Sequence, residues 1–169
     1  MNVELRQWKL SDARTLSNII SNLNILNNLR DGMPYPYTEN DAKEFISSIL
    51  SDDKNNNFIF AIICDGAVVG CIGAYRQGNI HRRTAEIGFY IAEEYWGKGI
   101  ATVAVSKICD YLFSNSDIIR LYAEPFSYNT ASCRVLEKAG FKYEGTLESN
   151  AVKSGKICDM KMYAKIKRI

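Results

Sequence analysis

Histidine is almost absent from this sequence, which contains a single one, His81. Cysteine is present in an odd number, five, at wide spacings that form no CxxC motif: Cys64, Cys71, Cys109, Cys133 and Cys158. Since zinc sites are usually built from closely spaced cysteine and histidine ligands, we expect no metal centre. Free thiols used mainly for packing are typical of a reducing compartment, so we expect a cytoplasmic location.

A strong net charge and long apolar runs are also lacking. The 21 basic and 19 acidic residues leave a formal net charge of +2, and the two basic clusters, 81–83 and 165–168, are short. A nucleic-acid-binding protein more often shows a basic stripe with interleaved aromatic residues, so we expect no nucleic-acid partner. No run of 18 apolar residues occurs, and the N-terminus carries Glu4 and Arg6. We therefore expect neither a membrane span nor a signal peptide.

What is present is the composition of a globular domain. The chain has 169 residues, of which 47% are hydrophobic and 24% are charged. No internal repeat, low-complexity tract or long linker divides it. We expect a single domain over residues 1–169, with its core between residues 3 and 167.

The first part of the chain predicts one strand and two helices. Val3 and Leu5 alternate with polar neighbours as an opening strand, and Ser11 is expected to cap a helix that continues to Leu23. An irregular loop follows, NNLRDGMPYPYT, which contains two of the three prolines and two tyrosines able to line a pocket. Thr38 and Asp41 form an approximate capping box at the start of the second helix.

The second part is richer in strands. Asp65-Gly66 is typical of a hairpin turn, and Gly140 of a helix C-terminus. The predicted elements are strands over 58–64, 67–75 and 83–92, a helix from 100, a strand over 118–125, a helix over 129–139, and strands over 141–147 and 156–166, the last two joined by a polar connection. The helix from residue 100 is expected to turn inward Ile100, Val103, Ala104, Ile108, Tyr111 and Leu112, with Lys107 at the edge of the stripe. The order favours an α+β fold with a mixed sheet over strict βα alternation.

EYWGKGIATVAV places Gly97 and Gly99 at the start of this helix. Glycine there lets a ligand approach the backbone closely, and the unpaired N–H groups of a helix N-terminus favour an anion. A Walker A loop is excluded because Lys98 is followed by glycine, and a Rossmann fingerprint because Thr102 stands in its last position. Two readings remain. One is an (Arg/Gln)-x-x-G-x-(G/A) phosphate loop that ends on Gly99 and Ala101; the other is a tight strand-to-helix turn without a ligand.

Longer stretches carry a family resemblance. AEIGFYIAEEYWGKGIATVAV resembles the acetyl-CoA strand, loop and helix of the GNAT superfamily of N-acetyltransferases, in its RimJ/RimL-like branch, and NTASCRVLEKAGFKYEG is similar to the second signature of that branch. LRDGMPYPYT and CDMKMYAKI look like its pocket loop and terminal strand. The resemblance covers residues 3–167 and departs at Trp96, where the first motif position is normally Arg or Gln.

The resemblance implies a fold and a co-substrate. The fold is α+β, with a central mixed, mostly antiparallel sheet of about seven strands, splayed into a V between the fourth and fifth strands and flanked by about four helices. The co-substrate is acetyl-CoA, with its pyrophosphate on backbone N–H groups of the glycine loop and its pantetheine arm paired with the strand at 88–92. The implied binding residues are Phe89, Tyr90, Ile91, Trp96, Gly97, Lys98, Gly99, Ile100, Ala101, Thr102, Asn129 and Ser132.

Acetyl transfer from a thioester to an amine needs a proton acceptor, a donor to the oxyanion and a proton donor for the thiolate. The resemblance points to Glu86 as the proton acceptor; the alternative is that this carboxylate orders the site by pairing with a basic group. A backbone N–H of Ile91 or a neighbour is the implied oxyanion donor. Leu136 replaces the tyrosine that many members use as the acid, and Ser132 is the implied substitute. Its alternative role is to serve an amide of the first helical turn.

The expected function is acetyl-CoA-dependent transfer of an acetyl group to a primary amine, by direct transfer in a ternary complex. The acceptor is a protein N-terminus or a small molecule, in a pocket expected to contain Asp31, Met33, Tyr35, Tyr37 and Glu86. Two alternatives stay open: a catalytically weak sensor that binds CoA or acetyl-CoA, and a detoxifying enzyme for a polyamine or antibiotic. We expect a monomer or homodimer.

Overall fold

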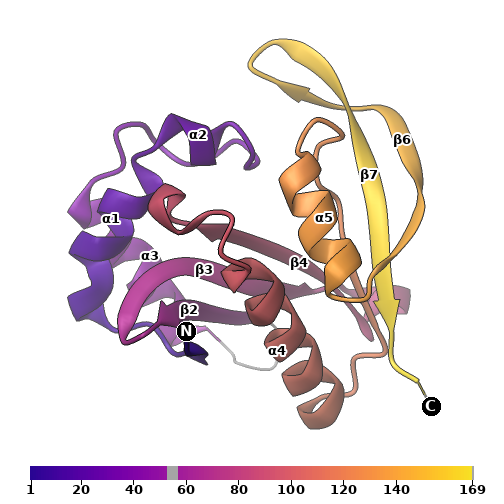
Figure 1. Cartoon of the computed structure of the whole chain (residues 1–169), viewed down its shortest axis with the longest axis horizontal. Coiled ribbons are helices and arrows are strands. Elements are labelled where there is room, and N and C mark those ends of the chain that lie inside the picture. The colour runs from indigo at the N-terminus through magenta and orange to yellow at the C-terminus, as the bar shows by residue number, and fades with distance from the viewer. Residues whose placement is uncertain (53–56, 169) are drawn as a thin grey trace.

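The computed structural model of the chain describes residues 1–52 and 57–168. Its strands form one seven-stranded sheet in the order β1-β2-β3-β4-β5-β7-β6, in which β4 and β5 are the parallel pair (Figure 1). The other neighbouring strands are antiparallel, so the predicted mixed sheet is confirmed. The strands are β1 (Val3–Arg6), β2 (Asn57–Cys64), β3 (Ala67–Arg76), β4 (Thr84–Ile91), β5 (Arg120–Ala123), β6 (Lys142–Lys153) and β7 (Lys156–Ile166).

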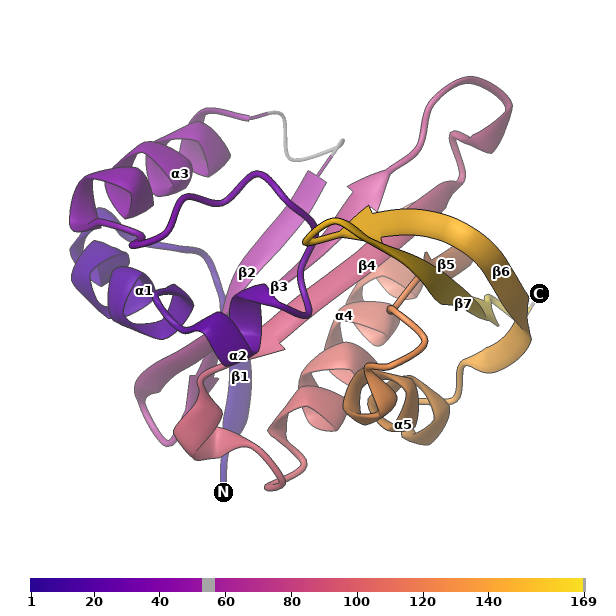
Figure 2. The same ribbon diagram turned by 90° about the horizontal axis from the view of Figure 1, so that it is seen from above.

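Helices cover both faces of this sheet. α1 and α3 lie on one face, and α4 and α5 on the other (Figure 2). The helix that the sequence predicts to continue to Leu23 stops earlier, because the chain bends at Ser21, and a single short turn, α2, follows the bend. The helices of the described residues are α1 (Ala13–Ile20), α2 (Leu23–Leu26), α3 (Glu39–Ser51), α4 (Ile100–Asn115) and α5 (Thr130–Lys138).

The first two long helices begin in different ways. At α3 the predicted capping box is confirmed: Thr38 Oγ1 accepts the Asp41 N–H at 3.1 Å, and Asp41 Oδ2 accepts the Thr38 N–H at 2.7 Å. At α1 the predicted Ser11 cap is wrong, because Ser11 lies inside a 3₁₀ turn that precedes the helix. Asp12 ends that turn instead. Its buried carboxylate binds the guanidinium of Arg6 in β1, and this holds the pKa of Asp12 below its usual range.

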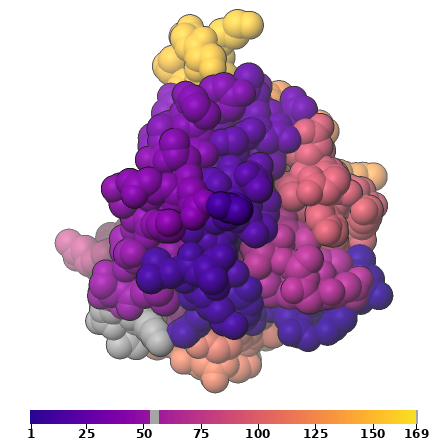
Figure 3. All heavy atoms as spheres, turned by 90° about the vertical axis from the view of Figure 1, so that its left-hand side faces the viewer, coloured from indigo at the N-terminus to yellow at the C-terminus, as the bar shows by residue number. Residues whose placement is uncertain are grey.

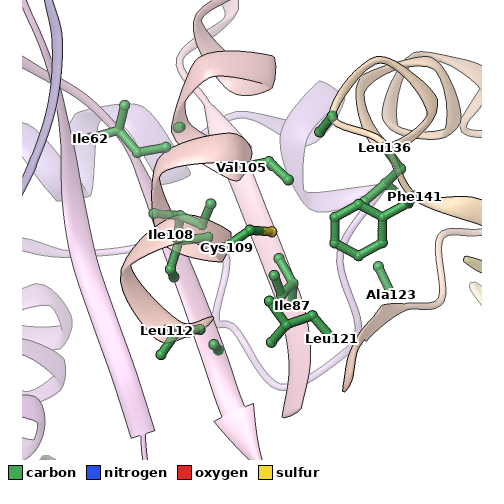
Figure 4. Packing of buried hydrophobic residues seen from close by; sticks show 14 of the residues in the cluster. Ile62, Ile87, Val105, Ile108, Cys109, Leu112, Leu121, Ala123, Leu136 and Phe141 are labelled. Atoms are coloured by element: carbon green, nitrogen blue, oxygen red, sulfur yellow. The ribbon is translucent and has the colours of Figure 1, made fainter. Parts of the chain in front are cut away.

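The main core lies between α4, α5 and the sheet. The close-up in Figure 4 shows side chains of α4 that face the strands: Val105, Ile108, Cys109 and Leu112. The predicted inward face of α4 is partly wrong, since two of its members are exposed: Val103 and Tyr111. Lys107, predicted at the edge of the stripe, is exposed as well. The buried stripe is rotated toward Val105 and Cys109 because α4 packs against Leu136 of α5 as well as against the sheet.

The strands β4 and β5 separate after a short stretch of pairing. Their parallel ladder joins Thr84–Glu86 to Arg120–Tyr122, and β4 then continues to Ile91 while β5 ends at Ala123. The V expected between the fourth and fifth strands is therefore present. Since the Ala92 N–H donates to Val69 of β3 and strand residues alternate, the N–H groups of Phe89 and Ile91 point to the side that β5 has left.

The last two strands form a longer hairpin than the sequence predicts. The first was expected over 141–147, followed by a polar connection. In the structure β6 continues to Lys153, and a tight turn at Ser154-Gly155 leads into β7, whose predicted span is confirmed. Residues 148–150 of this extension are polar and exposed, and the register shifts between Leu147 and Ala151. The extension therefore lacks the alternation that marks a half-buried strand. The hairpin tip stands out from the rest of the surface (Figure 3).

Gly70 of β3 has no room for a side chain. It lies between Ile62 of β2 and Ile91 of β4, and a Cβ at this position would lie 2.2 Å from the Tyr90 carbonyl oxygen. A backbone atom cannot move away without breaking the pairing of β3 with β4. Gly88 of β4 differs, because a Cβ there would meet only the Tyr75 ring, at 3.9 Å.

We expect Gly70→Ala to lower the free energy of unfolding by roughly 1–3 kcal/mol or more, since it forces atoms into an occupied space. Gly88→Ala is the matched control, and its effect should stay below about 1 kcal/mol. Urea unfolding followed by circular dichroism measures both. Equal losses in the two variants would contradict this account of β3–β4 packing.

Candidate functional site

The loop before α4 has the backbone of an anion site. Gly97 and Gly99 have φ angles of +73° and +79°, in the left-handed region, so the conformation itself requires glycine. The first intrahelical bond of α4 runs from the Val103 N–H to the Gly99 carbonyl, at 3.2 Å. The N–H groups of residues 100–102 therefore lie in the first turn of the helix. They point out of its N-terminus, which is the positive end of the helix dipole. A Cβ on either glycine would meet no atom within 4 Å, so the space in front of the loop is open.

A pocket of about 330 Å³ begins at this loop and follows the open edge of β4. We call it the cofactor pocket. Its walls also include α2 and the N-terminal turn of α5. The structure brings together most of the predicted binding residues along its lining: Phe89, Tyr90, Ile91, Trp96, Gly97, Gly99, Ile100, Ala101, Thr102, Asn129 and Ser132. Lys98 is not in the lining; its ammonium group lies 4.9 Å from the centre of the Tyr95 ring.

Trp96 has a specific role in this wall. Its indole Nε1–H donates to the carbonyl oxygen of Ile91 at 2.7 Å. That carbonyl ends β4 on the side that β5 has left, where no strand supplies a donor. The tryptophan therefore satisfies the last open acceptor of β4 and fixes the start of the loop. The departure from the Arg/Gln motif position has this structural explanation.

Asn129 and Ser132 are joined at the start of α5. Asn129 Oδ1 accepts the Ser132 N–H at 3.1 Å, and Asn129 Nδ2 donates to Ser132 Oγ at 2.9 Å. Asn129 thus supplies the helix cap. Because Ser132 Oγ accepts this bond, its own proton can be directed elsewhere.

A second pocket, of about 440 Å³, adjoins the first. We call it the acceptor pocket. Its lining includes residues of β4, residues at the end of β5, and Leu136 of α5. Leu136 is the position at which the family resemblance would place a tyrosine. Four residues line both pockets and so define their junction: Asn28, Leu29, Phe89 and Ser132.

Two carboxylates face the acceptor pocket. Glu86 of β4 and Glu124, just after β5, are about equally covered, with side-chain exposures of 19% and 20%. Arg30, in the segment after α2, binds Glu86 through both Nη atoms and lies 3.5 Å from Glu124 Oε2. Burial raises the pKa of Glu124, the charge of Glu86 raises it further, and Arg30 partly opposes this.

Sequence reasoning missed Glu124 and Arg30. Glu86 pairs with Tyr122 in the β4–β5 ladder, so Glu124, two residues further along, extends the same side of the sheet. The strand predicted over 118–125 contained Glu124, but assigning this residue to the site required the register of the ladder. Arg30 stands in a loop, where no periodicity marks it.

Four predicted pocket residues lie elsewhere. Asp31, Met33, Tyr35 and Tyr37 do not line the acceptor pocket or the cofactor pocket. Met33 and Tyr35 are 39% and 58% exposed, and Asp31 accepts a bond from Lys153 Nζ at 2.6 Å. Tyr37 packs against the core near α1 and α3, where burial raises its pKa to about 12.

Metal ligands do not gather within residues 1–52 and 57–168, where no group of at least three His, Cys, Asp or Glu side chains could hold an ion. Across the same residues, every helix is too short or too polar to cross a membrane. The five cysteines are free thiols, and Cys158 is the one that is not buried.

Comparison with known proteins accounts for this arrangement. Residues 2–142 match the family model described as "Acetyltransferase (GNAT) domain". The putative ribosomal N-acetyltransferase YdaF of Bacillus subtilis (strain 168) is 29% identical over 174 residues, covering 99% of this chain and 92% of the relative. The spermidine N(1)-acetyltransferase of Escherichia coli (strain K12) is 28% identical over 147 residues, covering 86% and 76%.

A solved structure has the same fold. RimJ of Mycobacterium smegmatis, in complex with CoA-disulfide, superimposes with a TM-score of 0.87 and is 26% identical. The match covers 97% of this chain and 81% of that chain.

We expect Gly99→Ala to weaken the binding of CoA about tenfold or more, because the methyl group would enter the open space in front of the loop. Gly155→Ala, in the turn between β6 and β7, is the matched control. It also adds a Cβ to a glycine with positive φ and open surroundings, but outside both pockets. Calorimetric titration with CoA should separate the two. If they lost affinity equally, or if neither did, the assignment of this loop would be wrong.

Proposed function

The chain belongs to the GNAT family of acetyltransferases, and we propose that it moves an acetyl group from acetyl-CoA to a primary amine by direct transfer in a ternary complex. One observation carries this proposal. The cofactor pocket and the acceptor pocket meet at Phe89 and Ser132, so a thioester in the first and an amine in the second would lie next to each other.

Backbone groups would hold the co-substrate. The N–H groups of the glycine loop and of the first turn of α4 suit a pyrophosphate, which explains why the segment needs no cluster of basic side chains. The N–H groups of Phe89 and Ile91 are available to an extended amide-containing arm, as an added strand would use them. Phe89 lies at the junction of the pockets, so its N–H is the better placed of the two to stabilise an oxyanion.

Two side-chain groups would move protons. The amine attacks the thioester carbonyl, a C–N bond forms, the C–S bond breaks, and the nitrogen loses a proton. We assign that proton to the Glu86–Glu124 pair, with Glu124 as the acceptor, because Arg30 binds Glu86 through both Nη atoms and lies 3.5 Å from Glu124 Oε2. Ser132 lies at the junction with its Oγ held by Asn129 Nδ2, and would pass its proton to the departing thiolate while it regains one from solvent.

The acceptor is an amine of a protein or of a small molecule. The named relatives span both, since one is a putative ribosomal N-acetyltransferase and another acetylates spermidine. A protein that only senses CoA would have the cofactor pocket but would need no carboxylates in an adjoining pocket.

We expect Glu124→Gln to lower kcat/KM by roughly 10²–10³ at neutral pH, because the proton acceptor is lost. Glu86→Gln should cause a comparable loss, since Arg30 would then turn to Glu124 and neutralise it. The double variant should be little worse than either single one, because the two carboxylates act as a unit. Steady-state rates measured by thiol release give all three values.

The dependence on pH provides the control. A carboxylate accepts a proton only above its pKa, and the pKa of Glu124 is raised, so the wild-type rate should fall as the pH drops through that raised value. The loss of kcat/KM in the variants should become smaller at high pH, because more of the amine is already neutral there. Small losses that do not vary with pH, with binding of CoA intact, would show that the carboxylates only order the site.

A further inference from the structure

Residues 27–31, the segment after α2, cross the open V and join its two sides. The Tyr128 hydroxyl donates to the Asn27 carbonyl at 2.7 Å, and Lys153 Nζ donates to Asp31 at 2.6 Å. Figure 2 shows the tip of the β6–β7 hairpin reaching this segment. Between these two contacts, the side chain of Arg30 bridges β4 and the end of β5. We call residues 27–31 the strap.

The strap stands at the junction of the two pockets. Asn28 and Leu29 line both of them, and Arg30 lines the acceptor pocket. The position of α2 is fixed by Asn22 and Asn24, whose side-chain amides donate to Glu93 at 2.6 and 2.9 Å. The strap is therefore held at both ends, and Arg30 reaches inward from a fixed backbone.

The charges of the acceptor pocket do not balance. Glu86 and Glu124 contribute two carboxylates to the lining of the pocket, and Arg30 contributes one cationic side chain. Tyr75, which also lines the pocket, stays neutral because burial raises its pKa to about 12. The lining therefore carries a net negative charge, which favours a cationic ligand over a neutral or anionic one.

Arg30 is the exposed member of this group. Its side chain is 60% exposed, while each carboxylate is about four-fifths covered. An ion pair with one well-exposed partner is a weak one, so a ligand can displace it. The two carboxylates are largely covered, so a cation that replaces the guanidinium between them is favoured over an empty site.

We propose that the guanidinium of Arg30 occupies the place of a cationic group of the acceptor, so that this pocket selects amines carrying a second positive charge near the amine that is acetylated. This inference rests on the proposed function of the same site. The acceptor cation displaces Arg30 outward and binds between Glu86 and Glu124. Arg30 then acts as a built-in competitor that excludes acceptors without such a charge.

The first experiment compares acceptors of similar size that differ in charge. The acceptors are 1,4-diaminobutane and butylamine, and the tripeptides Ala-Lys-Ala, Ala-Leu-Ala and Ala-Glu-Ala. We expect the wild-type kcat/KM to be about tenfold or more higher for the doubly charged amine of each set, and lowest for Ala-Glu-Ala. Equal values across each set, or the reverse order, would overturn the inference while leaving the acetyltransferase activity in place.

The second experiment removes the competitor. Arg30→Gln should lower KM for 1,4-diaminobutane by about three- to tenfold more than it changes KM for butylamine, while Arg30→Lys should resemble the wild type. Arg14→Gln is the matched control, since it removes the same charge from an exposed pair with Glu39 outside both pockets. An equal loss of rate for all acceptors in Arg30→Gln would mean that this arginine only supports the structure.

A binding measurement separates the inference from the proposed function. Calorimetric titration of 1,4-diaminobutane into the CoA-saturated protein requires no turnover. Tighter binding to Arg30→Gln than to wild type supports the inference even if no acceptor is acetylated, an outcome that would refute the proposed function alone. Unchanged or weaker binding would contradict the inference whatever the rates are.

Discussion

The short pairing of β4 with β5 is the constraint on which the site depends. The two strands share the ladder from Thr84 to Glu86 and then separate, while β4 stays paired with β3 along its whole length. An extended strand that is supported on one side alone keeps its shape and exposes a row of N–H and C=O groups on the other. Both pockets lie along that edge, and the V is therefore the common origin of the two binding surfaces.

The two ends of the V present different chemistry. At the end of β4, the site consists of backbone: two glycines with positive φ, the first turn of α4, and a carbonyl that Trp96 satisfies. Near the point where the strands separate, it consists of charged side chains, Glu86 and Glu124 with Arg30 between them. The backbone end suits a ligand that is the same in every turnover, whereas the side-chain end can be altered by single substitutions. Substitutions at the side-chain end can therefore change which acceptor a relative of this chain recognises.

Local signals predicted most of the fold. The Thr38 capping box and the Asp65-Gly66 hairpin followed from turn and capping chemistry, and the span of β7 followed from its strand pattern; both kinds of signal act within a few residues. The Ser11 cap, the inward face of α4 and the length of β6 failed because tertiary contacts decided them. Asp12 pairs with a strand, α4 packs against a second helix, and the extension of β6 is paired without being buried.

The candidate site divides in the same way. The loop at 97–102 was predictable because the glycines and the helix start are contiguous in sequence. Glu124 and Arg30 were not predictable. The position of Glu124 beside Glu86 depends on the register of the parallel ladder, and that of Arg30 depends on how the strap crosses the V. The tyrosine-rich loop at 31–37 looked like pocket wall by composition, yet its side chains lie outside the two pockets.

The most direct test of this account is residue-resolved hydrogen exchange along β4, with and without CoA. The amides of Gly88 and Tyr90 face β3 and should already exchange slowly. Those of Phe89 and Ile91 face the open edge and should become protected by about tenfold or more when CoA binds, because the bound arm takes the place of the missing strand. If CoA bound while the exchange of Phe89 and Ile91 stayed the same, the open edge of β4 would not be the binding surface.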